Sequence, residues 1–245
     1  MVRKKRIEPL EVHEVVGNLE IKEGEIVALV GGGGKSTLLS AIGELHGQGT
    51  VLTTTTKMGS DQKGEANLLI RPSKKELTVA LGETSPVLIW DRIDGEKAFG
   101  VDPLLPKSWL PEATRVIVEA DGARRHPAKA PAPHEPVLPQ GVTTIIAVIG
   151  ADAINRVIED QCHRPLRVAA VVECSPYERL TPERASVLLL NPNGSKKGLE
   201  PGMRFVIAIT KVSSENQNLV DRLVEELQSF DSEVEIHLVL SHNEG

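Results

Sequence analysis

The chain has 245 residues, 40% hydrophobic and 25% charged, which is the composition of a folded globular protein and argues against disorder. Its net charge of −6 argues against nucleic acid as a partner, and no apolar run reaches the ~20 residues that span a bilayer. The basic start at Arg3 to Arg6 is not followed by an apolar stretch, so we expect a cytosolic protein without a signal peptide or a membrane partner. Cys162 and Cys174 are too few for a disulfide framework, and we expect reduced thiols.

Apolar strand-like runs alternate with helix-like stretches along most of the chain. The predicted strands are 25–30, 50–54, 87–90, 115–118, 143–149, 204–209 and 234–240. The predicted helices are 35–45, 73–81, 152–160, 182–190 and 215–230, the last two opened by the capping residues Thr181 and Ser214. This alternation predicts an α/β fold of three layers, a mostly parallel sheet with helices on both faces, in a single domain that spans residues 1–245.

Two segments interrupt the alternation. Asp94-Gly95 lies between two extended stretches and predicts a small hairpin insert at about 86–102. The segment from His126 to Pro139 contains five prolines, so it predicts a shaped loop that forms neither a helix nor an inner strand.

The sequence GGGGKST at residues 31–37 lies between a predicted buried strand and an amphipathic helix. Glycines let backbone N–H groups turn towards phosphate oxygens at a helix N-terminus, where the helix dipole favours anions. The motif therefore predicts a P-loop in which Lys35 contacts the β- and γ-phosphates, Ser36 binds Mg²⁺ and Thr37 adds a phosphate contact. The glycines expected in this phosphate cradle are Gly31, Gly32, Gly33 and Gly34.

This P-loop is short. Only two residues separate Gly31 from Gly34-Lys35, whereas the common pattern has four. Such short loops resemble those of Mur-type ligases more than those of small GTPases. The alternative interpretation is a glycine-rich turn between strand and helix that binds no ligand.

Two carboxylates end the strand at 115–118. The strand runs into Glu119-Ala120-Asp121-Gly122, and its alternation places Glu119 and Asp121 on the same side. This arrangement resembles a Walker B site, with Lys35, Glu119 and Asp121 as the expected catalytic residues and Asp121 joining Ser36 as a Mg²⁺ ligand. Which acid holds a Mg²⁺-bound water and which orients a nucleophile stays open, and both can instead be solvated acids of a turn.

Polar residues also follow two other predicted strands. Thr55, Thr56 and Lys57 come after strand 50–54, where open α/β sheets bind ligands, although threonine also simply suits strands. Lys211 stands in Thr-Lys-Val-Ser, at the place where many GTPases carry Asn-Lys-x-Asp. We expect Lys211 to stack along a nucleotide base, but Ser213 supplies no carboxylate for guanine. The choice between ATP and GTP therefore stays open, with ATP favoured.

The proline-rich loop as a whole runs from Gly122 to Pro139 and carries charged side chains directly after the predicted Walker B strand. We expect it to form a second wall of the site, facing the phosphates or an anionic substrate, and the alternative is a solvated connector. The residues expected on this wall are Arg124, Arg125, Lys129, His134 and Glu135. Cys162-His163-Arg164 has no third ligand nearby in the sequence and does not predict a metal site.

Six sequence blocks carry a resemblance to a known family: GGGGKST at Gly31, TTTTKM at Thr53, EADGA at Glu119, KAPAPHEPVLP at Lys129, IGADA at Ile149 and HRP at His163. With these blocks the chain, over nearly its whole length, resembles the YqeC-type selenium-dependent hydroxylase accessory proteins. The proline-rich block is the most specific, because ordinary P-loop proteins have nothing like it. The resemblance implies a cytosolic, nucleotide-dependent factor that matures selenium-dependent molybdenum hydroxylases or supplies their selenium-containing cofactor. The family often carries alanine and threonine where this chain has Gly32 and Ser36, and threonine preserves the hydroxyl.

Three functions follow from these observations. The first is a Mg²⁺- and ATP- or GTP-binding accessory factor with slow hydrolysis, whose partners are the nucleotide and a molybdenum hydroxylase or its cofactor-maturation proteins. The second is a small-molecule kinase or ATP-dependent ligase, although Mur-type ligases need separate substrate domains for which 245 residues leave little room. The third is a nucleotide-gated binding protein without turnover.

Overall fold

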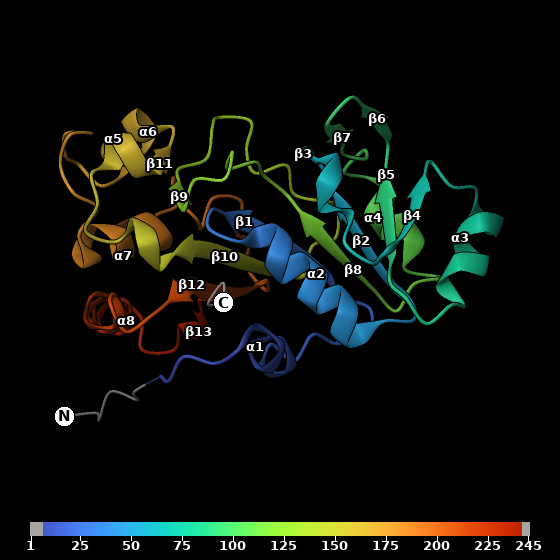
Figure 1. Cartoon of the computed structure of the whole chain (residues 1–245), viewed down its shortest axis with the longest axis horizontal. Helices are drawn as coiled ribbons and strands as arrows, with labels where there is room; N and C mark the ends of the chain where they lie inside the picture. Colours follow the sequence, from blue (N-terminus) through green and yellow to red (C-terminus); the bar gives the residue numbers. More distant parts are fainter. Residues whose placement is uncertain (1–6, 242–245) are drawn as a thin grey trace.

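The computed structural model describes residues 7–241, so the basic start at Arg3 to Arg6 lies outside the described residues. An eight-stranded sheet forms the centre, in the order β13-β12-β10-β1-β8-β2-β5-β4, and all its neighbouring strands are parallel (Figure 1). Its strands are β1 (Ile26–Gly31), β2 (Thr50–Thr54), β4 (Asn67–Ile70), β5 (Val87–Trp90), β8 (Arg115–Glu119), β10 (Thr144–Gly150), β12 (Arg204–Val212) and β13 (Glu235–Leu240). The predicted α/β fold with a mostly parallel sheet is thereby confirmed.

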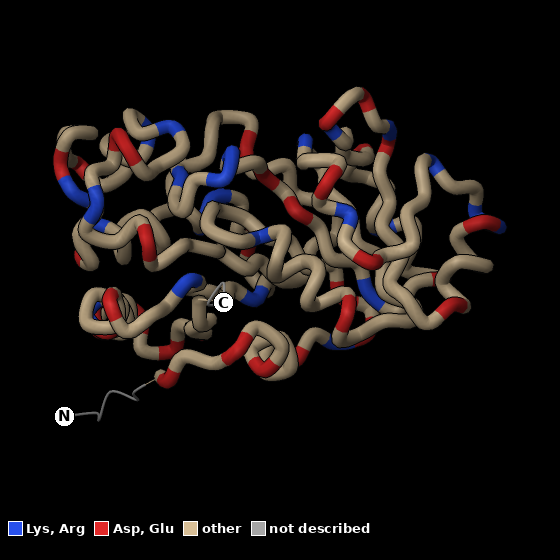
Figure 2. The backbone as a smooth tube through the Cα atoms, in the orientation of Figure 1, with Lys and Arg blue, Asp and Glu red and all other residues tan. Residues whose placement is uncertain are grey.

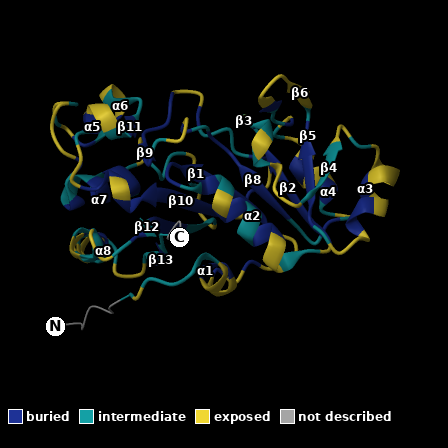
Figure 3. Cartoon of the chain, viewed as in Figure 1, coloured by how far each residue is buried: buried dark blue, intermediate teal, exposed yellow. Residues whose placement is uncertain are grey.

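Helices cover both faces of this sheet, because successive strand residues point to opposite sides. Val27 and Leu29 of β1 pack in one core cluster with α1 (Val12–Asn18) and α2 (Lys35–His46). Ala28 and Val30 pack in a second cluster on the other face. The helices of that face are α3 (Lys74–Leu81), α4 (Leu105–Trp109), α6 (Pro165–Val171), α7 (Pro182–Leu190) and α8 (Gln217–Phe230). Figure 3 shows the strands buried and the exposed residues on the outer helices and loops.

The predicted hairpin is present but shorter than expected. It consists of β6 (Arg92–Asp94) and β7 (Lys97–Phe99), which pair antiparallel around Asp94-Gly95. The preceding residues, Val87–Trp90, belong to the main sheet instead. A third strand, β3 (Lys57–Gly59), pairs with β7, and the 3₁₀ helix η1 (Ser60–Lys63) follows it. This small sheet stands beside the carboxyl end of β2.

The proline-rich segment is a loop with one short strand. Ala128–Lys129 forms β9, which pairs in parallel with β11 (Cys162–His163) and with no other strand among the described residues. The loop lies against the glycine-rich segment 31–37, for which we keep the name P-loop, because the carbonyl oxygen of His126 accepts a hydrogen bond from Gly33 N–H at 3.1 Å. Thus two segments far apart in the sequence come together over the P-loop.

The helix predicted at 152–160 was wrong. The segment forms a 3₁₀ turn, η2 (Ala151–Ala153), and a short helix, α5 (Ile158–Gln161), separated by Asn155 in a left-handed conformation with φ 60°. Its backbone N–H groups turn to another segment, since Asn155 N–H donates to the carbonyl of Leu180 and Ile158 N–H to that of Glu178. These long-range bonds replace the bonds of a continuous helix.

The two predicted helix caps differ in outcome. The hydroxyl of Thr181 caps α7 by accepting a hydrogen bond from Arg184 N–H, as predicted. Ser214 does not cap α8, which begins after Asn216. Within residues 7–241, no helix is both long and apolar enough to cross a membrane.

Candidate functional site

A cavity of about 980 Å³ opens at the carboxyl ends of β1, β2, β8 and β12, at the N-terminus of α2. Its size lies at the upper end of the range of about 300–1,000 Å³ typical of ligand pockets. Among residues 7–241, seven cationic and four acidic side chains line it, although the whole chain has a net charge of −6. Figure 2 shows basic and acidic residues interspersed along the chain, so this local excess of positive charge stands out and attracts anions.

The P-loop glycines hold the loop close to its neighbours. Gly31, Gly33 and Gly34 have positive φ values of 98°, 81° and 112°, which side-chain-bearing residues rarely adopt. A methyl group would lie 2.2 Å from the carbonyl oxygen of Val148 at Gly31, 2.6 Å from that of His126 at Gly32, and 2.3 Å from Gly150 N at Gly33. At Gly34 the nearest atom would be 3.7 Å away. Three of the four glycines therefore permit packing against protein backbone.

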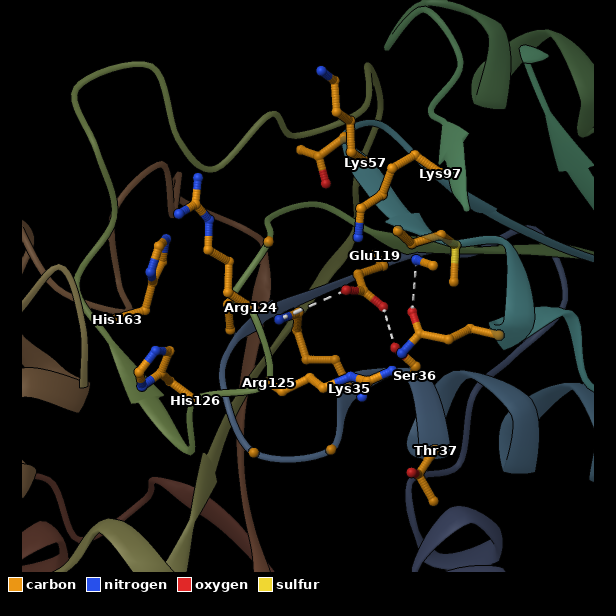
Figure 4. Close-up of a pocket in the computed structure, with 18 of the residues that line it drawn as sticks. Lys35, Ser36, Thr37, Lys57, Lys97, Glu119, Arg124, Arg125, His126 and His163 are labelled. Atoms are coloured by element: carbon orange, nitrogen blue, oxygen red, sulfur yellow. Dashed lines mark hydrogen bonds and ion pairs between the residues drawn. The ribbon is translucent and has the colours of Figure 1, made fainter. Parts of the chain in front are cut away.

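The helix that follows the P-loop presents its N-terminus to the cavity. The N–H groups of the first four positions of a helix, here residues 34–37, have no intrahelical partner. The side chains of Lys35, Ser36 and Thr37 line the same cavity (Figure 4). N–H groups, a hydroxyl pair and a lysine at a helix N-terminus together form a suitable environment for phosphate.

Lys35 contacts the two acids that follow strand β8, Glu119 and Asp121. The Lys35 ammonium donates to the carbonyl oxygen of Gly31 at 2.6 Å and lies 3.2 Å from Asp121 Oδ1 and 3.8 Å from Glu119 Oε1. The Ser36 hydroxyl donates to Glu119 Oε2 at 2.9 Å. Burial raises the pKa of Glu119, although the charge of Lys35 and the hydrogen bond from Ser36 act in the opposite direction.

The two acids have different surroundings. Glu119 lines the cavity beside Ser36, whereas Asp121 is only 2% exposed and lies behind it. Both oxygens of Asp121 accept hydrogen bonds from Gly31 N–H at 3.1 Å, and Lys129 Nζ lies 3.1 Å from Oδ2. In this arrangement Glu119 and Ser36 face the cavity side by side and would be the pair available to a Mg²⁺ there, while Asp121 lies behind them. Asp121 fixes the P-loop backbone and Lys35.

A buried charge chain continues from Asp121 into the proline-rich loop. We use this name for Lys35, Asp121, Lys129, Glu135 and Arg164, which contact one another in that order. Lys129 Nζ lies 2.7 Å from Glu135 Oε2, and Arg164 binds both Glu135 oxygens at 2.6 and 3.0 Å. Burial raises the pKa of Glu135, but the hydrogen bond and charge of Lys129, with Ala132 N–H and Arg164, outweigh it and lower this pKa to about 2. Glu135 is therefore ionised at neutral pH.

Of the residues expected on the second wall, four line the cavity and one is buried behind it. Arg124, Arg125, His134 and Glu135 line the cavity. Lys129 does not: it is only 3% exposed and is enclosed between Asp121 and Glu135. The reason is that two buried carboxylates need a cation, and the short strand β9 directs Lys129 to them.

Of the other residues predicted to bind the nucleotide, some line the cavity and one does not. Thr56 lines the cavity, but the Thr55 hydroxyl turns away and donates to the carbonyl of Val137 at 2.6 Å. Lys211 lines the cavity and pairs with Asp152 at 2.7 Å. Its neighbour Thr210, which the sequence did not single out, donates a hydrogen bond to the carbonyl oxygen of Gly33 and so ties β12 to the P-loop.

Sequence reasoning missed a histidine pair in the cavity. His126 and His163 stack with ring centroids 5.9 Å apart, and Arg164 and Lys97 line the same space. The HRP block pointed to His163 and Arg164, but nothing local connects them with His126, 37 positions earlier. Among residues 7–241, no cluster of three His, Cys, Asp or Glu side chains is suited to a metal ion. A Mg²⁺ at Ser36 and Glu119 would need phosphate oxygens and water as further ligands, which is the coordination that Mg²⁺ prefers.

Comparison with known proteins shows the family of this chain. No solved structure matches the chain. The chain is 29% identical, over 225 residues that cover 86% of each protein, to the "Uncharacterized protein YqeC" of Escherichia coli strain K12. A family model described as "YqeC protein" matches residues 27–166, from β1 through the P-loop, the acids and the proline-rich loop to the start of α6. Since this match covers more than half of the chain, the chain belongs to the YqeC family.

Proposed function

We propose that the protein binds a Mg²⁺-nucleoside triphosphate, ATP or GTP, and hydrolyses it slowly. The observation that carries this proposal is the placement of Lys35, Ser36 and Glu119 at the N-terminus of α2 inside a positively charged cavity. A triphosphate would receive the helix N–H groups and the Lys35 ammonium, while Mg²⁺ would bridge its oxygens to Ser36 and Glu119. Lys211 and Thr37 border the space left for the rest of the nucleotide.

The contacts of Lys35 support a role in phosphate binding. Lys35 now neutralises Asp121 and Glu119 and donates to the loop itself at 2.6 Å. An incoming phosphate would share this cation, and a Mg²⁺ at Glu119 would take over part of its neutralising role. Lys35 can thus pass from a structural contact to a phosphate contact without crossing the cavity.

Calorimetric titration with Mg-ATP and Mg-GTP tests this proposal. Lys35→Ala should lower nucleotide affinity by about 2 to 4 kcal/mol, because a charge-assisted phosphate contact is lost. Lys75→Ala, which removes an exposed lysine of α3, is the matched control and should bind like the wild type. Circular dichroism must show that Lys35→Ala stays folded. Unchanged affinity in a folded Lys35→Ala protein would refute nucleotide binding at the P-loop.

The roles of the two acids can be separated by varying Mg²⁺. Glu119→Gln should raise the Mg²⁺ concentration needed for tight nucleotide binding and slow hydrolysis, because it removes a carboxylate from the metal position. Asp121→Asn should act mainly on stability, since Asp121 holds Gly31 N–H and two lysines. If Asp121→Asn raised the Mg²⁺ requirement and Glu119→Gln changed mainly the stability, Asp121 would be the Mg²⁺ ligand instead.

Phosphate release distinguishes the leading proposal from its alternatives. An accessory NTPase releases phosphate slowly from nucleotide alone, a kinase or ligase requires a second substrate, and a nucleotide-gated binding protein shows no turnover. The family resemblance favours an accessory role with a molybdenum hydroxylase or its cofactor-maturation proteins as the partner. Copurification of such an enzyme with the wild type but not with folded Lys35→Ala would support that partner.

A further inference from the structure

One side of the cavity is built from residues that the P-loop does not use. Arg124 and His126 come from the proline-rich loop, and His163 and Arg164 from β11 and the start of α6. We call these four residues the His–Arg wall. In Figure 4, His126 and His163 lie on the side away from Ser36 and Thr37, with Arg124 and Lys35 between.

The wall is held in place by contacts within the protein. Parallel pairing of β9 with β11 sets Lys129 opposite His163, and the two imidazoles stack at 5.9 Å with an angle of 23° between the rings. Arg164 is fixed by two hydrogen bonds to Glu135, at the end of the buried charge chain. Preorganised side chains lose little conformational entropy when they bind a ligand.

The wall also concentrates positive charge around a neutral ring. Burial, followed by the charges of Arg164, Lys129 and Arg124, lowers the pKa of His163 to about 4. At neutral pH its imidazole is therefore uncharged and can donate one N–H. Arg124 has a left-handed backbone with φ 49°, an exposed side chain and no ion-pair partner within the described part of the chain. Glu135 pairs with both Arg164 and Lys129, so Arg124 is the cation of the wall that is left for an anion.

We propose that the His–Arg wall binds the phosphate or carboxylate group of a second, non-nucleotide small molecule. The Arg124 guanidinium can bind such an oxyanion through paired N–H donors, the neutral imidazole of His163 adds a hydrogen bond, and the stacked rings offer a flat face. The site deepens the proposed function and rests on it in one respect: the nucleotide occupies the P-loop side, so the second molecule binds next to its phosphates.

The site can be tested by titrating the protein with inorganic phosphate and with malonate. The titration is monitored by ¹H NMR through the histidine Cε1–H signals. His126→Gln and His163→Gln assign the two resonances. With the P-loop saturated by a non-hydrolysable Mg-ATP analogue, at least one probe should shift both signals saturably; which one does so distinguishes a phosphate from a carboxylate ligand. Arg124→Gln should weaken that binding by about tenfold. The matched control is Arg71→Gln, which removes an exposed arginine outside the cavity and should leave the affinity unchanged.

The other possible results refute either the His–Arg wall as a binding site or the proposed nucleotide binding. Absence of a saturable shift with both probes refutes the wall as a binding site. Displacement of the probe by the nucleotide analogue also refutes it, because the wall would then belong to the triphosphate. Equal weakening by Arg71→Gln would show a general charge effect and no site. If the analogue itself does not bind, the proposed function fails, and the same titration of the nucleotide-free protein still decides the wall.

Discussion

Among the charged residues outside the P-loop, we expect substitution of Lys129 to lower the free energy of unfolding the most. Its ammonium lies 3.1 Å from Asp121 Oδ2 and 2.7 Å from Glu135 Oε2, and it donates to the carbonyl of Gly122 at 2.8 Å. Lys129→Met keeps most of the side-chain volume but leaves two buried carboxylates without their shared cation. Breaking a buried ion pair in this way costs about 3–5 kcal/mol. Because Lys35 and Arg164 remain, we expect the lower end, about 3 kcal/mol.

Urea unfolding followed by circular dichroism measures this loss at pH 7 and again at pH 4. In the wild type, the pKa of Glu135 is depressed to about 2, so its contribution to stability is complete above its unfolded pKa and is lost as the pH falls through about 2. In Lys129→Met, Glu135 loses the charge and hydrogen bond that lower its pKa while its burial remains, so it takes up a proton more readily in the folded state. The stability difference between the two proteins should therefore be smaller at pH 4 than at pH 7.

Lys197→Met is the control for this experiment. Lys197 reaches the same loop but donates only to the backbone carbonyls of Ala132 and Pro133, at 2.7 and 2.8 Å. Its loss strands no carboxylate and should cost only about 1 kcal/mol. A Lys129→Met protein no less stable than Lys197→Met, or a difference that grows on acidification, would refute the assignment of Lys129 as the counterion.

Three further predictions concern the scaffold. Gly31→Ala should lower the free energy of unfolding by about 2–4 kcal/mol, since its methyl group would lie 2.2 Å from the carbonyl oxygen of Val148 at a positive φ; urea unfolding will show whether it does. Thr181→Ala should cost about 1 kcal/mol of stability, whereas Ser214→Ala should change it little; equal losses would contradict the observed caps. Cys162 is 1% exposed and burial raises its thiol pKa to about 12, so alkylation at pH 8 should label it only after unfolding, as peptide mass spectrometry can test.

The strongly apolar strands of the sheet could be predicted because burial on both faces leaves continuous aliphatic runs. Asn67–Ile70 was not predicted as a strand, since β4 has four half-buried or exposed residues at the sheet edge and no clear alternation. The helix predicted at 152–160 failed because its polar and apolar residues fit a helix, while the backbone bonds of Asn155 and Ile158 go to residues 178–180. Local patterns carry no information about such long-range partners.

In the candidate site too, the parts that depend on local sequence could be predicted, and those that depend on long-range contacts could not. The P-loop is contiguous, so GGGGKST by itself placed Lys35 and Ser36 at a helix N-terminus, and strand alternation placed Glu119 near them. The opposite side depends on the pairing of β9 with β11, two strands of two residues each. Strands this short have no periodicity, so the stacking of His126 on His163 and the burial of Lys129 could not be read from the sequence.

The packing of the P-loop glycines affects how a mutational scan of this protein should be interpreted. Loss of activity on substitution of Gly31, Gly32 or Gly33 would ordinarily be taken as evidence for phosphate binding. Here a side chain at each position collides with backbone atoms of Val148, His126 or Gly150, whether or not a ligand is present. Such variants report on the assembly of the loop with its neighbours. Ligand binding itself is tested by substitutions of Lys35, Ser36 and Thr37 that remove a functional group and leave the backbone unchanged.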